Sequence, residues 1–218
     1  MFGMRRTSLL VSGSVVMAVL AVSAQLAAER VPLAHAASIA APVCSGKPAT
    51  QQGTAGFDNI VGTPGRDVIL ALGGDDRIDG RGGDDLICGG DGDDYMVGGG
   101  GNDRLQGQRG VDTVSFFESK GVNVDLAVGT ARGAGTDRLA SIENILGSPR
   151  RDTLKGSSAP NVLHGLAGPD ALAARGGKDT LNGGIGRDSL DGGAGKDSCI
   201  GGRGVDTVRR CERLLSVP

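Results

Sequence analysis

The chain has 218 residues, of which 40 are glycine, 2% are aromatic and none is tryptophan. This composition excludes an ordinary globular core, which needs large apolar side chains, and so much glycine raises the entropy cost of ordering the backbone. The formal net charge is -2, but residues 53–115 hold twelve Asp against five Arg, whereas residues 147–209 hold seven Asp against nine Arg and Lys. Neither part interleaves basic and aromatic residues as a nucleic-acid groove does, so no nucleic-acid partner is expected.

The N-terminus has the pattern of a signal peptide. Arg5 and Arg6 precede an apolar run over residues 9–24, as a charged region precedes the apolar region of a secretion signal. Two small-residue cleavage patterns end at Ala24 and Ala36, and the later one is favoured because a polar stretch follows it. A membrane span is the alternative, but the run is short for a bilayer and is diluted by small polar residues. We therefore expect the first 36 residues to be removed from a secreted, extracellular protein without a stable membrane anchor.

The chain contains four cysteines, Cys44, Cys88, Cys199 and Cys211, all beyond the predicted signal. An even number of cysteines in an exported chain indicates disulfides. Three pairings are open: the sequence does not choose among them, although a Cys199–Cys211 bond would close a short loop and leave Cys44 to pair with Cys88. A zinc site is disfavoured because the short paired spacings of zinc ligands are missing.

A nine-residue repeat dominates the rest of the chain. Seven units run without a gap from Gly53, and seven more run from Gly147. In the first block the fourth position is always Gly, the sixth always Asp and the eighth always apolar; across both blocks only Asn161 breaks the row of sixth-position aspartates. A short, fixed period predicts a solenoid. The candidate metal ligands are the sixth-position residues Asp58, Asp67, Asp76, Asp85, Asp94, Asp103, Asp112, Asp170, Asp179, Asp188, Asp197 and Asp206.

The repeat pattern itself indicates how these aspartates are arranged. Positions 7 to 9 suit a short strand with position 8 facing inward, and positions 1 to 6 suit a glycine-rich turn. Two units complete one coil, so turns two units apart stack at the strand spacing of about 4.8 Å. Stacked carboxylates repel one another unless a cation lies between them. Calcium accepts six to eight carboxylate and carbonyl oxygens in flexible geometry, whereas magnesium demands a tighter octahedron, so Ca²⁺ is the expected ion and the apo chain is expected to be largely disordered.

These units resemble the RTX, or hemolysin-type, nonapeptide G-G-x-G-x-D-x-U-x, in which U is a large apolar residue. The resemblance covers about 126 residues in the two blocks. It implies an all-β fold, a parallel β-roll or β-helix solenoid of nine-residue repeats whose two blocks are joined by an irregular coil. It also implies calcium binding, as in the small secreted bacterial proteins built from this repeat.

The expected organisation is a signal peptide (1–36), an N-terminal segment (37–52), the first repeat block (53–115), an irregular connecting coil (116–146), the second block (147–209) and a C-terminal tail (210–218). Within the coil, Val122, Val124, Leu126 and Val128 alternate as in a strand. The register break leaves two interpretations, an irregular coil of one continuous solenoid or a hinge between two. Phe116 and its neighbour Phe117 are candidates to cap the first block.

The second block departs from the pattern at its start. Asn161 is neutral, and Arg150 and Ala159 replace the fourth-position glycine. Basic residues also occupy position 5 in later units, where the first block carries acids. We predict that residues 147–161 bind calcium weakly or not at all, and that the later units bind it.

The sequence shows no enzyme signature. It contains two histidines, His35 in the predicted signal and His164 at an outward-facing ninth position, and no H-E-x-x-H motif. The expectation is a calcium-binding protein without catalytic activity. Two alternatives stay open: a calcium-stapled adhesive or cell-surface matrix protein, and a secreted hydrolase with an unrecognised carboxylate site.

Overall fold

A computed structural model describes residues 43–133 and 135–214. The predicted signal peptide, residues 37–42 of the N-terminal segment and residues 215–218 of the tail lie outside the described residues. The described residues all belong to one of the two compact units of the chain, Ala41–Pro218. In this part of the chain every regular element is a strand, as the all-β prediction requires, and no helix there has the length and apolarity to cross a membrane.

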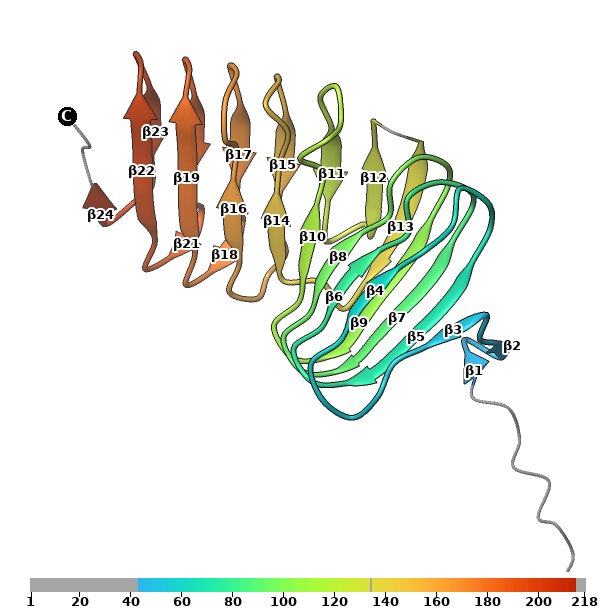
Figure 1. Cartoon of the computed structure of the whole chain (residues 1–218). Helices are drawn as coiled ribbons and strands as arrows, with labels where there is room; N and C mark the ends of the chain where they lie inside the picture. Colours follow the sequence, from blue (N-terminus) through green and yellow to red (C-terminus); the bar gives the residue numbers. More distant parts are fainter. Residues whose placement is uncertain (1–42, 134, 215–218) are drawn as a thin grey trace, which may run out of the picture. The chain divides into compact units, whose positions relative to one another are not determined.

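Two long sheets contain most of the strands (Figure 1). The nine-stranded sheet runs in the order β24 (Arg213–Leu214), β22 (Ser198–Arg203), β19 (Thr180–Ile185), β16 (Val162–His164), β14 (Asn144–Leu146), β10 (Thr113–Ser115), β8 (Tyr95–Val97), β6 (Arg77–Asp79) and β4 (Asn59–Val61). The eleven-stranded sheet runs in the order β23 (Thr207–Arg209), β20 (Ser189–Asp191), β17 (Ala171–Ala173), β15 (Thr153–Lys155), β11 (Asn123–Asp125), β12 (Thr130–Arg132), β13 (Thr136–Ala140), β9 (Arg104–Arg109), β7 (Leu86–Asp91), β5 (Val68–Gly73) and β3 (Gln51–Gln52). Two small sheets pair β1 (Val43–Cys44) with β2 (Lys47–Pro48) and β18 (Gly176–Gly177) with β21 (Ala194–Gly195).

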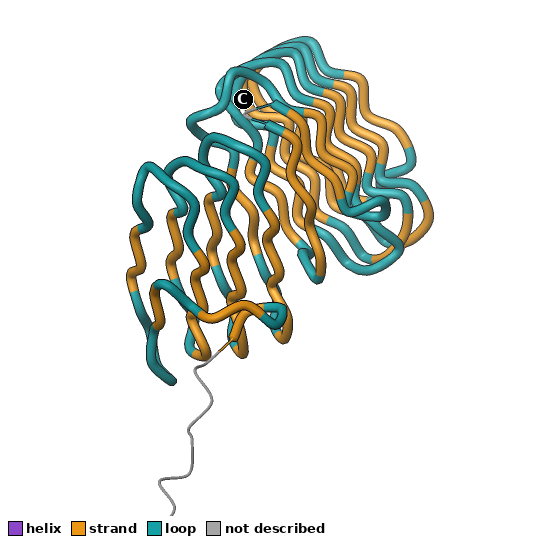
Figure 2. Tube along the Cα trace, turned by 90° about the vertical axis from the view of Figure 1, so that its right-hand side faces the viewer, coloured by secondary structure: helices purple, strands orange, loops and turns teal. Residues whose placement is uncertain are grey.

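The strand register confirms the predicted solenoid. Within the repeat blocks the paired strands are parallel, and Ile60 lies opposite Ile78, which lies opposite Met96. Partners are thus two nine-residue units apart, and consecutive units alternate between the two sheets. Figure 2 shows the resulting rows of strands from successive coils, with loops joining one sheet to the other. The short period therefore sets both the pairing and the stacking of the turns.

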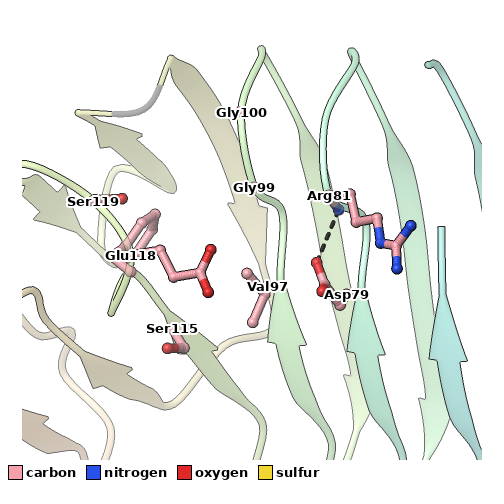
Figure 3. Close-up of a pocket in the computed structure, with 9 residues that line it drawn as sticks. Asp79, Arg81, Val97, Gly99, Gly100, Ser115, Glu118 and Ser119 are labelled. Carbon is pink, nitrogen blue, oxygen red and sulfur yellow. Dashed lines mark hydrogen bonds between the residues drawn. The ribbon is translucent and has the colours of Figure 1, made fainter. Parts of the chain in front are cut away.

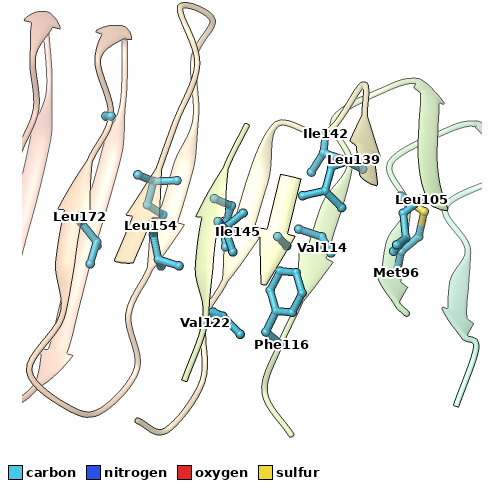
Figure 4. Close-up of a cluster of buried hydrophobic side chains, with 14 of the residues drawn as sticks. Met96, Leu105, Val114, Phe116, Val122, Leu139, Ile142, Ile145, Leu154 and Leu172 are labelled. Carbon is cyan, nitrogen blue, oxygen red and sulfur yellow. The ribbon is translucent and has the colours of Figure 1, made fainter. Parts of the chain in front are cut away.

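One side chain per unit builds the core between the two sheets. The eighth-position residues are at most 1% exposed across both blocks, apart from partly buried residues at the ends of the stack, Ile60 and Val208. Figure 4 shows part of this row, including Met96, Leu105, Val114, Leu154 and Leu172. Full burial of such a side chain contributes about 1.5–3 kcal/mol. A core one residue deep can hold the coils in register, but it leaves the turns to be stabilised by other contacts.

Two disulfides brace the repeat blocks. Cys44 bonds to Cys88 with their Cα atoms 5.8 Å apart, and Cys199 bonds to Cys211 with their Cα atoms 5.9 Å apart. The first bond ties the segment before the repeats to β7, where Cys88 joins a small buried cluster on the outer side of the sheet. The second joins β22 to the segment after the last repeat unit and so closes a short loop that contains this unit. Of the three pairings that the sequence allows, the structure has the one that joins neighbouring segments.

The connecting segment continues both sheets. On one side Val114 of β10 lies opposite Ile145 of β14, in a parallel pair. On the other side β9 pairs in parallel with β13, and β11 pairs in parallel with β15. Between them β12 pairs antiparallel with both β11 and β13, an insertion that the nine-residue pattern does not contain. Both sheets therefore run through the segment, which makes it a wide turn of a continuous solenoid.

The aromatic pair of the connecting segment divides between core and solvent. Phe116 is 7% exposed and packs in the main core, whereas Phe117 is 56% exposed. Val122 and Val124 are buried beside Phe116, while Val128 is exposed beyond the end of β11. Because both sheets run on through this segment, the first block has no end to cap, and Phe116 is instead part of the continuous core. The alternation of valines marks a strand of three residues, Asn123–Asp125.

Candidate metal sites in the repeat turns

The sixth-position aspartates stack in two columns, one before each sheet. Their side chains are buried in the interior of each block; Asp85 is 2% exposed and Asp112 is 0% exposed. The backbone N–H of Asp67 donates to Oδ1 of Asp85 at 2.8 Å, and the N–H of Asp85 donates to Oδ1 of Asp103 at 2.9 Å. The same contact joins Asp58 to Asp76, Asp76 to Asp94, Asp94 to Asp112, Asp152 to Asp170, Asp170 to Asp188, Asp179 to Asp197 and Asp188 to Asp206. One carboxylate oxygen of each aspartate thus supports the stacking itself.

The second carboxylate oxygen, Oδ2, has no such partner in most turns. Within the described residues it is buried without a hydrogen bond in Asp76, Asp85, Asp94, Asp103, Asp112, Asp170, Asp179, Asp188 and Asp197. A buried polar atom without a partner costs about 1–3 kcal/mol, and more when it is charged. Nine such oxygens cost as much as the whole net stability of a typical domain, about 5–15 kcal/mol. The turns therefore require cations or protons that the polypeptide does not supply.

The first residue of most turns is a glycine that both Oδ2 of the same turn and a carbonyl oxygen of the next coil approach closely. A Cβ atom on Gly80 would lie 2.6 Å from Oδ2 of Asp85 and 2.7 Å from the carbonyl oxygen of Gly98, one coil further on. A Cβ on Gly183 would lie 2.6 Å from Oδ2 of Asp188 and similarly close to the next coil's carbonyl. A carboxylate oxygen and a carbonyl oxygen therefore lie close together at this residue, which is Ala71 in the turn of Asp76 and Ala174 in the turn of Asp179. Hard oxygen donors of this kind suit calcium.

No three His, Cys, Asp or Glu side chains gather at one point in the described part of the chain. Each site in these turns must therefore combine one or two carboxylates with backbone carbonyls. Calcium accepts such mixed oxygen ligands readily, whereas zinc prefers cysteine and histidine. The donor set thus fits the expected ion.

The electrostatics of the columns agree with a need for cations. The pKa of Asp85 and of Asp94 is raised to about 6, mainly by burial and in part by neighbouring aspartates. Burial likewise raises the pKa of Asp112 and Asp170 to about 7, again with a contribution from adjacent acids. A raised carboxyl pKa means that the folded chain disfavours the charged form. A bound divalent cation would reverse that preference by neutralising the carboxylates.

The first two turns of each block satisfy their sixth residue differently. Thr54 donates its N–H to Oδ2 of Asp58 at 2.6 Å and its hydroxyl to the same oxygen at 3.0 Å. Thr63 makes the same pair of contacts with Asp67, at 2.6 and 2.9 Å. Burial alone would raise the pKa of Asp67, but the Thr63 donors outweigh it and lower the pKa. Position 2 of these turns thus provides the donors that the other turns lack.

Serine has the same role where the second block begins. The Ser148 N–H donates to Oδ2 of Asp152 at 2.6 Å, and the Ser157 N–H donates to Oδ1 of Asn161 at 2.7 Å. The amide of Asn161 in turn donates to the carbonyl oxygen of Glu143 at 2.7 Å. These turns are closed by hydrogen bonds, which is a physical basis for the weak binding predicted at residues 147–161.

Two acidic residues of the connecting segment also belong to these columns, and the sequence analysis did not predict them. The N–H of Asp103 donates to Oδ1 of Asp137 at 3.0 Å, and the N–H of Asp112 donates to Oε2 of Glu143 at 2.9 Å. Asp137 is buried, and burial raises its pKa to about 6. A signal for Asp137 exists, because Gly135, Asp137 and Leu139 keep the G-x-D-x-U spacing. The signal for Glu143 is weaker: it stands two residues before the apolar Ile145, as a sixth-position acid does, but its unit lacks the fourth-position glycine and has Glu in place of Asp.

A separate cavity of about 430 Å³ lies on the outer face of the first block (Figure 3). Asp79, Val97 and Ser115 line it from three neighbouring strands, and Glu118 faces it from the connecting segment. Oδ1 of Asp79 accepts the N–H of Arg81 at 2.9 Å. No histidine lines this cavity, and His164 lies in β16 with a pKa lowered by burial. The cavity therefore lacks the paired serine and histidine of nucleophilic hydrolases.

Comparison with known families agrees with the geometry of the turns. A sequence model described as the RTX calcium-binding nonapeptide repeat matches the chain four times, at residues 52–87, 89–116, 146–181 and 174–208. No curated protein is similar enough to the chain to be matched. The four matches together cover more than half of the chain and contain all twelve aspartates that the sequence predicts as ligands. The chain therefore belongs to the family of RTX calcium-binding nonapeptide-repeat proteins.

Proposed function

We propose that this protein is secreted and binds calcium ions between its stacked turns, and that these ions drive its folding. The observation that carries the proposal is the set of buried Oδ2 atoms without a partner, most of which lie in a cradle, that is, beside a glycine that a carbonyl oxygen of the next coil also approaches. Calcium supplies the missing positive charge and tolerates irregular oxygen ligands. The two disulfides favour an oxidising compartment, which supports the interpretation of residues 1–36 as a secretion signal.

The predicted ligands differ in how they would bind. Nine aspartates offer a free Oδ2 and are assigned to calcium: Asp76, Asp85, Asp94, Asp103, Asp112, Asp170, Asp179, Asp188 and Asp197. Asp58 and Asp67, although also expected as ligands, have that oxygen occupied by threonine donors and are assigned weak binding or none. Asp206 is half-buried at the end of its column and accepts only the N–H of Asp188. We assign it a weaker site.

Ion binding and folding are coupled in this proposal. Without calcium the columns place ionised carboxylates one strand spacing apart in a buried setting, which destabilises the stack. The free energy of ion binding then becomes free energy of folding. Extracellular calcium modules bind at about 10⁻⁴–10⁻³ M. The protein would therefore be disordered in a calcium-poor compartment and fold outside the cell.

Far-UV circular dichroism of the mature chain, with its disulfides intact, tests the proposal. In chelator the spectrum should show mostly disordered chain, and millimolar calcium should restore the β signal, whereas magnesium at the same concentration should restore little of it. Calorimetric titration should show uptake of several ions per chain. A chain that stays fully ordered after exhaustive chelation and takes up no calcium would contradict the proposal.

A further inference from the structure

We propose that the connecting segment adds one calcium site beyond the repeats, formed by Asp112, the carbonyl of Ser141 and the carboxylate of Glu143. The inference rests on the proposed calcium function. Ser141 and Glu143 lie between the matched repeat segments, which end at residue 116 and resume at residue 146. The site would bind the last turn of the first block to the segment that leads into the second.

The free oxygen at this junction belongs to Asp112. Its side chain is 0% exposed, and its Oδ2 has no hydrogen-bond partner. A Cβ on Gly107, the first residue of the same turn, would collide with both this Oδ2 and the carbonyl oxygen of Ser141. The arrangement repeats that of Gly80, with Ser141 in the place of the next coil's first residue. The cradle of the repeat turns is therefore present although the repeat has ended.

Glu143 completes the junction in the manner of a repeat aspartate. Its Oε2 accepts the N–H of Asp112 at 2.9 Å, the contact that Oδ1 of the next aspartate makes elsewhere in the column. The N–H groups of Glu143 and Asn144 both donate to the carbonyl oxygen of Asp112, at 3.1 and 2.9 Å. Only six residues, 141–146, lie between the strand before this turn and the next full unit. The longer glutamate side chain thus spans a gap that the shortened turn leaves.

The column closes without an ion immediately after Glu143. The next residue in the column is Asn161, whose amide donates to the Glu143 carbonyl and whose Oδ1 accepts the Ser157 N–H. A neutral amide therefore replaces the carboxylate at that step. The free Oδ2 of Asp112 and the Ser141 carbonyl lie close together, and the Glu143 carboxylate is held beside them on the Asp112 N–H. These oxygens are a donor set for a divalent cation, and the adjacent step has no comparable charge. The column of the first block would thus hold one ion more than its repeats specify.

The experiment compares Glu143→Gln with Glu118→Gln in the full mature chain. Both changes remove one negative charge from the connecting segment, but Glu118 is exposed and has no partner among the described contacts of the column. Calcium stoichiometry is measured by equilibrium dialysis and affinity by calorimetry. We expect Glu143→Gln to bind about one ion fewer, or to bind one ion about tenfold more weakly, and Glu118→Gln to match the wild type. Hydrogen exchange of the wild type should show residues 141–146 protected only when calcium is present.

The outcomes separate this inference from the function on which it rests. If the wild type takes up calcium but Glu143→Gln binds the same number of ions with the same affinities, the junction site is wrong and the repeat sites stand. If the wild type takes up no calcium, the proposed function fails as well. Should Glu143→Gln fail to fold even in calcium, the wild-type exchange decides: protection of residues 141–146 that is independent of calcium overturns the inference.

Discussion

The turns that open each repeat block and the turns in the block interiors carry the same acid, apart from Asn161, in two different settings. In the opening turns Thr63 places its N–H and hydroxyl on Oδ2 of Asp67. In the interior turns the second residue has a left-handed backbone, as in Arg81 with φ of 67°, and its N–H bonds to Asp79 instead. Oδ2 of Asp85 therefore has no hydrogen-bond partner. The conformation of position 2 decides whether a turn is closed by the chain itself or needs an ion.

The comparison shows that aspartate has two separable roles in this repeat. Its Oδ1 accepts a backbone N–H from the previous coil in interior turns such as that of Asp85 and also in the opening turn of Asp152, at 2.8 Å in each case. Its Oδ2 is satisfied by donors in one class of turn and unsatisfied in the other. A sixth-position aspartate is thus diagnostic of stacking, and the second residue of the turn indicates whether calcium is required.

The largest expected effect is the response of the two classes of turn to calcium removal. In chelator, amide hydrogen exchange should rise steeply in the interior turns between residues 71 and 112 and between residues 165 and 197. The rise should be smaller in the opening turns, residues 53–67 and 147–161, because their carboxylates and Asn161 keep hydrogen-bond donors. The calcium-loaded protein is the control. Equal loss of protection in both classes would break the comparison.

Adding a side chain at the first glycine of an interior turn should have the next largest effect. Gly80→Ala places a Cβ at 2.6 Å from Oδ2 of Asp85 and 2.7 Å from a backbone carbonyl oxygen, so the turn must shift. We expect the calcium-loaded protein to lose about 1–3 kcal/mol in free energy of unfolding and to bind fewer ions. The matched control is Gly56→Ala, at which a Cβ meets no atom within 4 Å. Calcium-dependent thermal unfolding measures both, and equal behaviour of the two variants would count against a cradle.

Removing the acid from each class of turn ranks the sites directly. Asp85→Ala removes a carboxylate with a bare Oδ2, whereas Asp152→Ala removes one that Ser148 already satisfies at 2.6 Å. Both variants lose the Oδ1 contact to the previous segment, at 2.8 Å in each case, so that loss cancels in the comparison. Asp85→Ala should lower calcium affinity more in a calorimetric titration. Equal losses would refute the ranking.

Much of the fold follows from the nine-residue period, because each unit carries its own strand, turn and core residue. Residues such as Leu154 and Leu172 pair as the period requires. The antiparallel strand β12 lies outside this logic, since no repeat specifies it. The sequence also does not show that Oδ2 is hydrogen-bonded in Asp67 and unpaired in Asp85, because this difference depends on the backbone angle at position 2 rather than on the acid. Glu143 stands in a shortened unit, and only the stacking shows that it replaces an aspartate.

A change of pH should have the smallest effect, and it should act on the interior turns alone. The folded-state pKa of Asp85 is raised to about 6 and that of Asp170 to about 7, above the ordinary value of 3.8. For a raised carboxyl pKa, the contribution to stability is fully present below the unfolded pKa and is lost as the pH rises through the folded one. Metal-free protein should therefore gain order as the pH falls from about 8 to about 5.

In the opening turns the stability contribution of the aspartate depends on pH in the opposite direction. The pKa of Asp67 is lowered in the folded chain, so its contribution is present above the unfolded value and is lost only when the pH falls through the folded one. Acidification to about pH 5 leaves it ionised and bonded to Thr63. Circular dichroism of metal-free protein should show a partial recovery of the β signal, and exchange corrected for intrinsic rates should place it in the interior turns. Because protons neutralise Oδ2 without bridging to a carbonyl, the recovery should stay below that produced by calcium, and an equal recovery would mean that charge neutralisation alone, without coordination, holds the coils together.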